Sequence, residues 1–241
     1  MIDWLLGRDN QDPQVEVAGR LLPLVIRRNA QARRMTMRLA PDGSEVRVTL
    51  PTWGRSAEAL AFARTRAGWL AGQLAAVPVP VELQNGTDLA YLGAPLAINH
   101  DPARPRKVAL GEGELLIGGP AGSLQSRIKR WLEGEARRLM AEDLSYYCLR
   151  AGQPQQRLML TSAKRRWGSC ARDGTIRINW RLVMAPSFVR RSVVAHEVAH
   201  LVHFDHSPAF HDFLDEIFEG DLRGANRWLK REGKNLYLPM G

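Results

Sequence analysis

Residues 187–211 read SFVRRSVVAHEVAHLVHFDHSPAFH, and this stretch holds five of the six histidines in the chain. His196 and His200 are four residues apart, so in a helix their imidazoles lie on one face, one turn apart, where both can hold the same metal ion. Glu197 is turned by about 100° from His196 around the helix axis, which places its carboxylate beside the ion but outside the set of ligands. The pattern therefore predicts a metal-binding helix in which Glu197 is the general base and takes a proton from a water molecule that the ion activates.

The residues that flank this motif are nearly all apolar: Val193, Val194, Ala195, Val198, Ala199, Leu201 and Val202. A helix with this composition is buried nearly all round. Burying two histidines and a glutamate without partners would cost free energy, and a bound metal ion offsets that cost. We therefore predict one Zn²⁺ ion, because His-Glu-x-x-His on a helix is the zinc-hydrolase motif.

A catalytic zinc site normally has three protein ligands, so the motif needs a third. His203 lies seven residues after His196 and on the same helix face, but three ligands along one axis over about 10 Å do not form a tetrahedron. Glu219 has a spacing close to that of zinc enzymes whose third ligand is a Glu on a later helix. A helix that begins at Pro208 would, however, carry the chain about 16 Å away by then. His206 follows the end of the metal-binding helix, where the chain can fold back, and we predict it as the third ligand.

The rest of the chain predicts an α+β fold with two regions. The boundary falls at the segment 118–122, which reads GGPAG and interrupts the pattern of strands and helices. Residues 1–120 are predicted to form a β-rich N-terminal region with one helix, and residues 121–241 a zincin-like metallohydrolase domain that contains the active-site helix. We expect strands at 24–28, 35–39, 46–50, 89–92, 96–99, 115–117, 157–162 and 175–182, and helices at 56–74, 123–150, 188–203 and from 208 onward.

Composition and charge exclude several classes of protein. Of the 241 residues, 45% are hydrophobic and 24% are charged, which excludes a disordered chain and a collagen-like repeat. The chain has two cysteines, no stretch long enough to span a membrane and no signal peptide, so we expect a cytoplasmic protein without a membrane partner. Residues 121–191 carry 15 basic and 5 acidic side chains, a net charge of +10, which indicates either a solvated surface or a groove for an anionic ligand such as a nucleotide or nucleic acid.

Several motifs resemble those of the YgjP-type metal-dependent hydrolases, which are zincin metallopeptidase-like proteins related to the SprT-like group. The motifs are RRWGSC at 165–170, IRINWRL at 176–182, HEVAH at 196–200 and HSPAF at 206–210, with weaker similarity at 33–50 and 88–93. The resemblance implies a zincin fold, a zinc ion, His206 as third ligand and Glu197 as general base. It also leaves nucleotide pyrophosphatase activity open.

Arg166 and Trp167 are the predicted substrate-binding residues. They lie between two expected strands and ahead of the metal-binding helix, and in zincins the strand at the rim of the cleft pairs with an extended substrate. The structural alternative places Trp167 in the core and a bulge at Gly168. The oxyanion of the reaction needs a stabilising group, which Arg166 or His203 could provide. Cys170 is expected to be a buried, inert thiol rather than a reactive thiol or a metal ligand.

The leading hypothesis is a zinc-dependent hydrolase, most specifically a metallopeptidase that acts on a peptide or protein substrate. Two alternatives use the same metal site. One is a metal-dependent nucleotide phosphohydrolase (pyrophosphatase) whose basic segment clamps phosphates, and the other is a peptidase that acts on DNA-bound proteins. Arg165 and Arg166 are adjacent and in a strand would point to opposite faces. Only one can then face the cleft unless the strand bulges at Gly168, which favours a peptide over a triphosphate.

Overall fold

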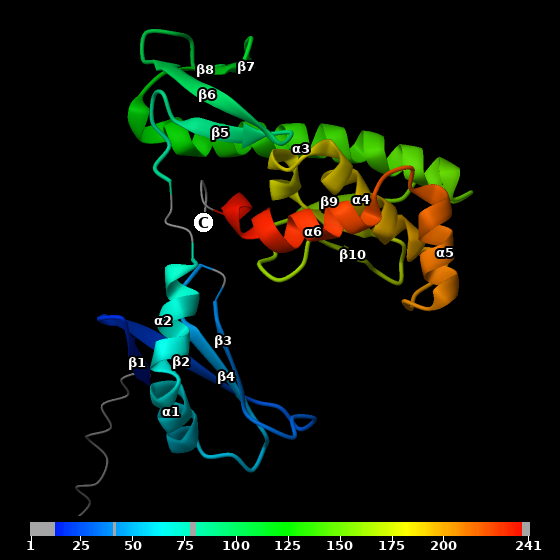
Figure 1. Cartoon of the computed structure of the whole chain (residues 1–241). Coiled ribbons are helices and arrows are strands. Elements are labelled where there is room, and N and C mark those ends of the chain that lie inside the picture. Colours follow the sequence, from blue (N-terminus) through cyan, green and yellow to red (C-terminus); the bar gives the residue numbers. More distant parts are fainter. Residues whose placement is uncertain (1–12, 41, 78–80, 238–241) are drawn as a thin grey trace, which may run out of the picture. The chain divides into compact units, whose positions relative to one another are not determined.

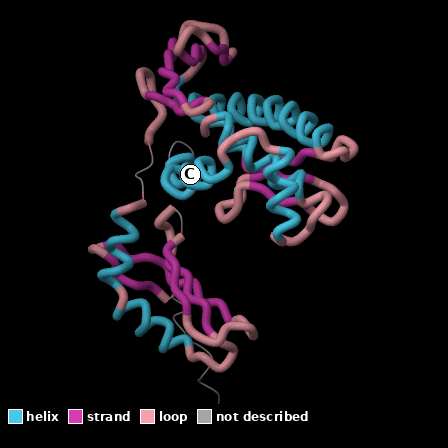
Figure 2. The backbone as a smooth tube through the Cα atoms, turned by 45° about the vertical axis from the view of Figure 1, so that its right-hand side comes forward, coloured by secondary structure: helices cyan, strands magenta, loops and turns pink. Residues whose placement is uncertain are grey.

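We describe the protein from a computed structural model, which covers residues 13–40, 42–77 and 81–237. The described residues form six α-helices and three β-sheets, an α+β fold (Figure 1; Figure 2). The chain divides into two compact units between residues 78 and 79. Within the described ranges, no helix is both long enough and apolar enough to cross a membrane.

The first unit is a four-stranded sheet that shares its core with two short helices. The strands are β1 Gln14–Val17, β2 Arg20–Arg28, β3 Thr36–Leu39 and β4 Val46–Leu50, in the order β1-β2-β4-β3. β2 and β4 are parallel, and the other neighbouring strands are antiparallel. The helices are α1 Ser56–Thr65 and α2 Ala67–Ala75. They replace the single helix predicted at 56–74, because Arg66 leaves the helical conformation, with φ −108° and ψ 16°.

The second unit begins with another four-stranded sheet, which packs against the first half of a long helix. The strands are β5 Asp88–Tyr91, β6 Ala94–Asp101, β7 Val108–Leu110 and β8 Glu114–Gly118, in the order β5-β6-β8-β7. The helix is α3 Leu124–Arg150, close to the prediction of 123–150. Leu89, Ile98 and Ile117 of the sheet are buried in the same hydrophobic core as Ile128 and Leu132 of the helix.

The two compact units differ from the predicted domains 1–120 and 121–241, because the chain divides at 78 and 79. The strand β8 does end at Gly118, and the chain turns at Gly119, which has a φ of +83°. A change from strand to helix does not separate domains here. The strands before it and the helix after it bury their apolar side chains against each other, so they belong to one core.

The remainder of the second unit places a small sheet beside the helix that contains the histidines. The strands are β9 Leu158–Thr161, β10 Gly168–Cys170 and β11 Ile176–Asn179, in the order β10-β11-β9. β10 is therefore an edge strand, and it is antiparallel to β11. The strand predicted at 175–182 ends at Asn179, whose side chain caps the 3-10 helix Trp180–Met184. The remaining α-helices are α4 Ser187–Ala199, α5 Pro208–Ile217 and α6 Leu222–Glu232.

The helix α4, which contains His196, ends earlier than the predicted range of 188–203. The backbone N–H groups of Leu201 and Val202 donate to carbonyl groups only three residues earlier, so the last turn is tighter than an α-helix. The α-helix consequently ends at Ala199, with His200 as its C-terminal capping residue. Seven residues, 201–207, therefore lie between His200 and the start of α5, and the chain can reverse within them.

Candidate metal centre

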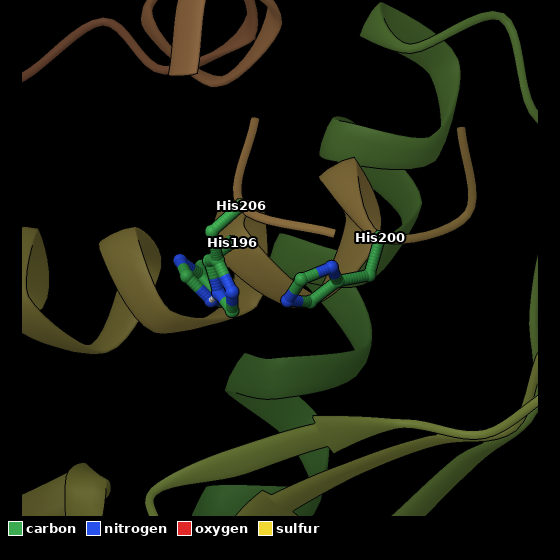
Figure 3. Close-up of side chains that lie close together, drawn as sticks. All are labelled: His196, His200 and His206. Carbon is green, nitrogen blue, oxygen red and sulfur yellow. Dashed lines mark hydrogen bonds between the residues drawn. The ribbon is translucent and has the colours of Figure 1, made fainter. Parts of the chain in front are cut away.

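Three histidine side chains, His196, His200 and His206, come together at the C-terminal end of α4 and form what we call the histidine cluster (Figure 3). His196 lies in the last turn of α4, and His206 lies in the loop before α5. One ring nitrogen of each side chain lies within 4.8 Å of the others. Nε2 of His206 is 3.2 Å from Nε2 of His196. In the part of the chain that the structure describes, this cluster is the group of side chains that could hold a metal ion.

The start of α5 positions His206. Ser207 caps the helix, since its hydroxyl oxygen accepts a hydrogen bond from the backbone N–H of Phe210, and Pro208 is the first helical residue, as the sequence predicts. The Phe210 ring is fully buried, and its centroid lies within 5.0 Å of the centroids of all three imidazoles. The first turn of α5 thus fixes His206 and supplies an apolar wall to the histidine cluster.

The lowered pKa values of His196 and His200 suit a metal ion, because ligating histidines must be neutral. Burial, with smaller contributions from neighbouring histidines, lowers the pKa of His196 to about 4, so this ring is neutral at pH 7. Burial also lowers the pKa of His200. Nδ1 of His200 lies 3.0 Å from the backbone oxygen of His203 and donates its proton to it, which leaves Nε2 to bind an ion.

Glu197 is the next residue after His196 in α4, and its side chain is only 6% exposed. Burial raises its pKa to about 7, against smaller lowering effects from the backbone N–H of Cys170 and the charge of Arg166. The glycine at 168 permits this placement, because a Cβ atom there would lie 2.6 Å from Cγ of Glu197. The carboxylate therefore lies against β10 and outside the histidine cluster.

The outer edge of β10 borders this carboxylate. On the inner side, backbone hydrogen bonds at Trp167 and Ala171 join the strand to β11. Backbone groups of alternate residues point to opposite sides of a strand, so those of Gly168 and Cys170 face away from β11. The N–H of Cys170 is accordingly the group that donates to Glu197. An edge strand with outward-facing backbone groups thus runs beside the buried glutamate.

The two predicted substrate-binding residues lie immediately before β10. Arg166 is exposed, and it lies close enough for its charge to lower the pKa of Glu197. Trp167 is half-buried, and its ring packs against the core with its centroid 5.6 Å from that of Tyr237. Cys170 is also half-buried. Burial first, and the charge of Glu197 second, raise the pKa of its thiol to about 11, in keeping with the inert thiol that the sequence predicts.

The two other candidates for a third ligand lie outside the histidine cluster. The imidazole of His203 faces Phe213, with 5.7 Å between the ring centroids. Glu219 forms an ion pair with Arg191 and accepts a hydrogen bond of 3.1 Å from the hydroxyl of Tyr147. The carboxylate of Glu219 therefore joins α3 to α4 and is not available to the cluster.

Sequence reasoning missed two contributions to the site. The first is the Phe210 wall, although this residue lies within the HSPAF motif at 206–210. The second is a buried ion pair, in which Nε of Arg190 on α4 lies 2.7 Å from Oδ2 of Asp143 on α3. Arg190 and Asp143 each place a charge on an otherwise apolar helix face, and such a charge in the sequence indicates a buried partner. Their pairing across 47 positions is not visible in one sequence.

A helix with two histidines and an intervening glutamate, completed by a third histidine from the following loop, is an arrangement of metal-dependent hydrolases. The chain belongs to the YgjP-like family: the family model described as "YgjP-like, metallopeptidase domain" matches residues 33–232, which spans both compact units. Searches of curated proteins and of solved structures gave no match. The family confirms the resemblance found in the motifs and supports a metal-dependent peptidase in the general sense.

Proposed function

We propose that the protein is a zinc-dependent peptidase whose active site is the histidine cluster together with Glu197. The proposal rests on one observation: three ring nitrogens lie within 4.8 Å of one another at the end of α4, next to a buried carboxylate. Three imidazoles leave the fourth position of a tetrahedral zinc ion open, which distinguishes catalytic from structural zinc sites. When bound, zinc supplies Lewis-acid chemistry, polarising a carbonyl group and acidifying water.

Glu197 is the proposed general base. A carboxyl group with a pKa of about 7 can accept a proton from water and return it to the leaving amine near neutral pH. A cation held by the histidine cluster would favour its ionised form. The hydrogen bond from the Cys170 N–H holds the carboxylate in one orientation, so the base is positioned before the substrate arrives.

The outer edge of β10 is the proposed binding surface for an extended peptide. Strand addition at this edge would use the outward-facing backbone groups of Gly168 and would bring the peptide past Glu197. Arg166 is the proposed oxyanion-stabilising residue, because it lies close enough for its charge to lower the pKa of Glu197. The ring of His203, the other candidate, faces Phe213 instead. The exposed part of the Trp167 indole would form the rest of the rim of this peptide-binding surface.

The test measures cleavage of an unfolded protein or peptide mixture by the full-length, zinc-loaded chain. We expect cleavage that a chelator abolishes and added zinc restores. Glu197→Gln should retain zinc and lose activity by about 100-fold or more. Glu112→Gln is the matched control, since it makes the same change of charge at an exposed position between β7 and β8, and it should cleave like the wild type.

The same preparations should be tested with nucleoside triphosphates and DNA. Glu197-dependent release of pyrophosphate or phosphate, with no peptide cleavage, would overturn the peptidase proposal and favour a phosphohydrolase. Cleavage confined to DNA-bound proteins, with binding to DNA that falls steeply with salt, would instead favour the third hypothesis. Unimpaired cleavage by Glu197→Gln would show that another group is the base.

A further inference from the structure

A cavity of about 230 Å³ lies at the N-terminal half of α3, in a part of the second unit that the peptidase proposal does not use. Its lining consists of three arginines and two apolar residues: Arg106, Val108, Arg127, Arg130 and Trp131. The cavity is separate from the histidine cluster. Arg127 precedes Asp143, the α3 residue that contacts α4, by 16 positions, which is about 24 Å along the helix.

Arg127 is a buried guanidinium whose hydrogen bonds are incomplete. The side chain is 9% exposed, Nη2 donates to the backbone oxygen of Pro120 at 2.7 Å, and Nε donates to that of Ser123 at 3.2 Å. Nη1 is buried and has no hydrogen-bond partner among the described residues. A buried charged donor without a partner is costly, so this nitrogen favours the entry of an acceptor.

The backbone at Gly119 brings a second arginine of the cavity close to Arg127. Gly119 has a φ of +83°, and a Cβ atom built on it would lie 3.2 Å from Nη1 of Arg127 and 2.6 Å from Cγ of Arg106. A side chain at this position would fill the space between the two arginines. The glycine therefore lets the Arg106 and Arg127 side chains lie close together against the backbone.

The positive charge of the cavity is not neutralised. Neither Arg106 nor Arg130 forms an ion pair within the described ranges, and both side chains are exposed at the rim. The carboxylates on the same part of α3 have other partners: Glu133 lies 4.0 Å from Lys129, and Glu135 pairs with Arg138. Three guanidinium groups thus converge on one cavity without a counter-charge.

We infer that this cavity binds a phosphate group. Guanidinium groups match the oxygens of phosphate through paired hydrogen bonds, and three of them suit a dianion better than a carboxylate. A water molecule occupies about 30 Å³ in the liquid, so 230 Å³ admits a tetrahedral oxyanion with several waters but is smaller than a typical cavity for a drug-sized ligand. Val108 and Trp131 close one side with an apolar wall, and Tyr91 holds the indole at a centroid distance of 5.0 Å.

The test titrates inorganic phosphate into the full-length, zinc-loaded protein at constant ionic strength, followed by calorimetry and by phosphorus NMR. The variant is Arg106→Gln/Arg130→Gln, which changes two exposed side chains and leaves the buried Arg127 in place. Its matched control is Arg137→Gln/Arg223→Gln, which removes the same charge from two exposed arginines outside the cavity. We expect one phosphate per chain, binding at least tenfold weaker in the first variant, and binding within twofold of wild type in the control.

Three outcomes would overturn the inference. The first is the absence of saturable binding at millimolar phosphate. The second is an equal weakening in both double variants, which would mean that net charge and not the cavity attracts the anion. The third is unchanged affinity in both, which would place the phosphate elsewhere on the protein, such as at the metal centre.

Discussion

Arg190 of α4 donates a hydrogen bond to Asp143 of α3, with 2.7 Å between Nε and Oδ2, and both side chains are at most 7% exposed. Arg190 lies six residues before His196, so the pair fixes how α4 packs on α3 near the histidine cluster. Each member of such a pair has lost its hydration and depends on the other for compensation. The contact therefore links the stability of the second unit to the placement of the histidine cluster.

Replacing only one member of this pair should destabilise the protein. Asp143→Asn keeps the shape of the side chain but leaves the Arg190 charge buried without a counter-charge, and we expect a loss of about 3–5 kcal/mol in the free energy of unfolding. Urea denaturation followed by circular dichroism measures the effect. The apolar double variant Asp143→Leu/Arg190→Met should recover most of the loss, because it removes both charges. A stability of Asp143→Asn within 1 kcal/mol of wild type would contradict the role given to the pair.

Removal of His206 should weaken zinc binding. His206→Ala deletes one of three clustered imidazoles, and we expect an affinity at least about 100-fold lower in a competitive chelator titration. His203→Ala and Glu219→Ala are the controls, since both side chains lie outside the histidine cluster. Glu219→Ala should lower stability, because Arg191 and Tyr147 lose their partner, yet it should retain zinc. Stoichiometric zinc in His206→Ala, combined with zinc loss in Glu219→Ala, would refute the assignment.

The histidine cluster was predictable because its information is local. The four-residue spacing of His196 and His200 fixes their common face, and the Ser207-Pro208 start of α5 fixes where the chain turns back. The same holds for α3, whose apolar stripe has the period of a helix. Short-range spacing and capping chemistry leave few alternatives at these positions.

The features that the sequence did not predict depend on contacts between distant residues. The chain divides at 78 and 79 because side chains of the second sheet, such as Ile98, share a core with Ile128 of α3. The glycines near 119 interrupt the sequence pattern between these two residues and so wrongly predict a domain boundary there. The closeness of Gly168 to Glu197 requires knowing that β10 is the edge strand beside α4. No pattern of hydrophobic spacing in one sequence specifies which strand forms the edge.

A methyl group at position 168 should disturb Glu197, the proposed general base, without lowering the affinity for zinc. The Cβ atom of Gly168→Ala would overlap the Glu197 side chain, so we expect the carboxylate to move, peptidase activity to fall and stability to drop by about 1–3 kcal/mol, with zinc content unchanged. Gly134→Ala is the control, because its Cβ meets nothing within 4 Å on α3, and it should gain up to about 1 kcal/mol from helix propensity. Activity, metal content and thermal unfolding distinguish the two variants. Full activity in Gly168→Ala would show that Glu197 tolerates displacement or is not the base.

The thiol of Cys170 should resist alkylation until the pH is high. Its pKa is raised from 9.0 to about 11, chiefly by burial, so at pH 8 the folded protein holds about 100-fold less thiolate at this position than the unfolded chain. The unfolded chain loses this proton first as the pH rises from about 9 towards 11. Ionisation of Cys170 therefore lowers the free energy of unfolding across that window, and the stabilisation is fully present only below it.

Iodoacetamide labelling between pH 7 and 10, read peptide by peptide with mass spectrometry, measures this difference directly. Cys148 is 1% exposed and serves as the internal control, because its labelling in native buffer would report unfolding of the second unit. We expect slow labelling of Cys170 in the native protein, fast labelling in urea, and almost none at Cys148 without urea. Native labelling of Cys170 at pH 8 as fast as in urea, with Cys148 still protected, would mean that Cys170 has a reactive thiolate beside Glu197 rather than the protonated thiol that a raised pKa requires.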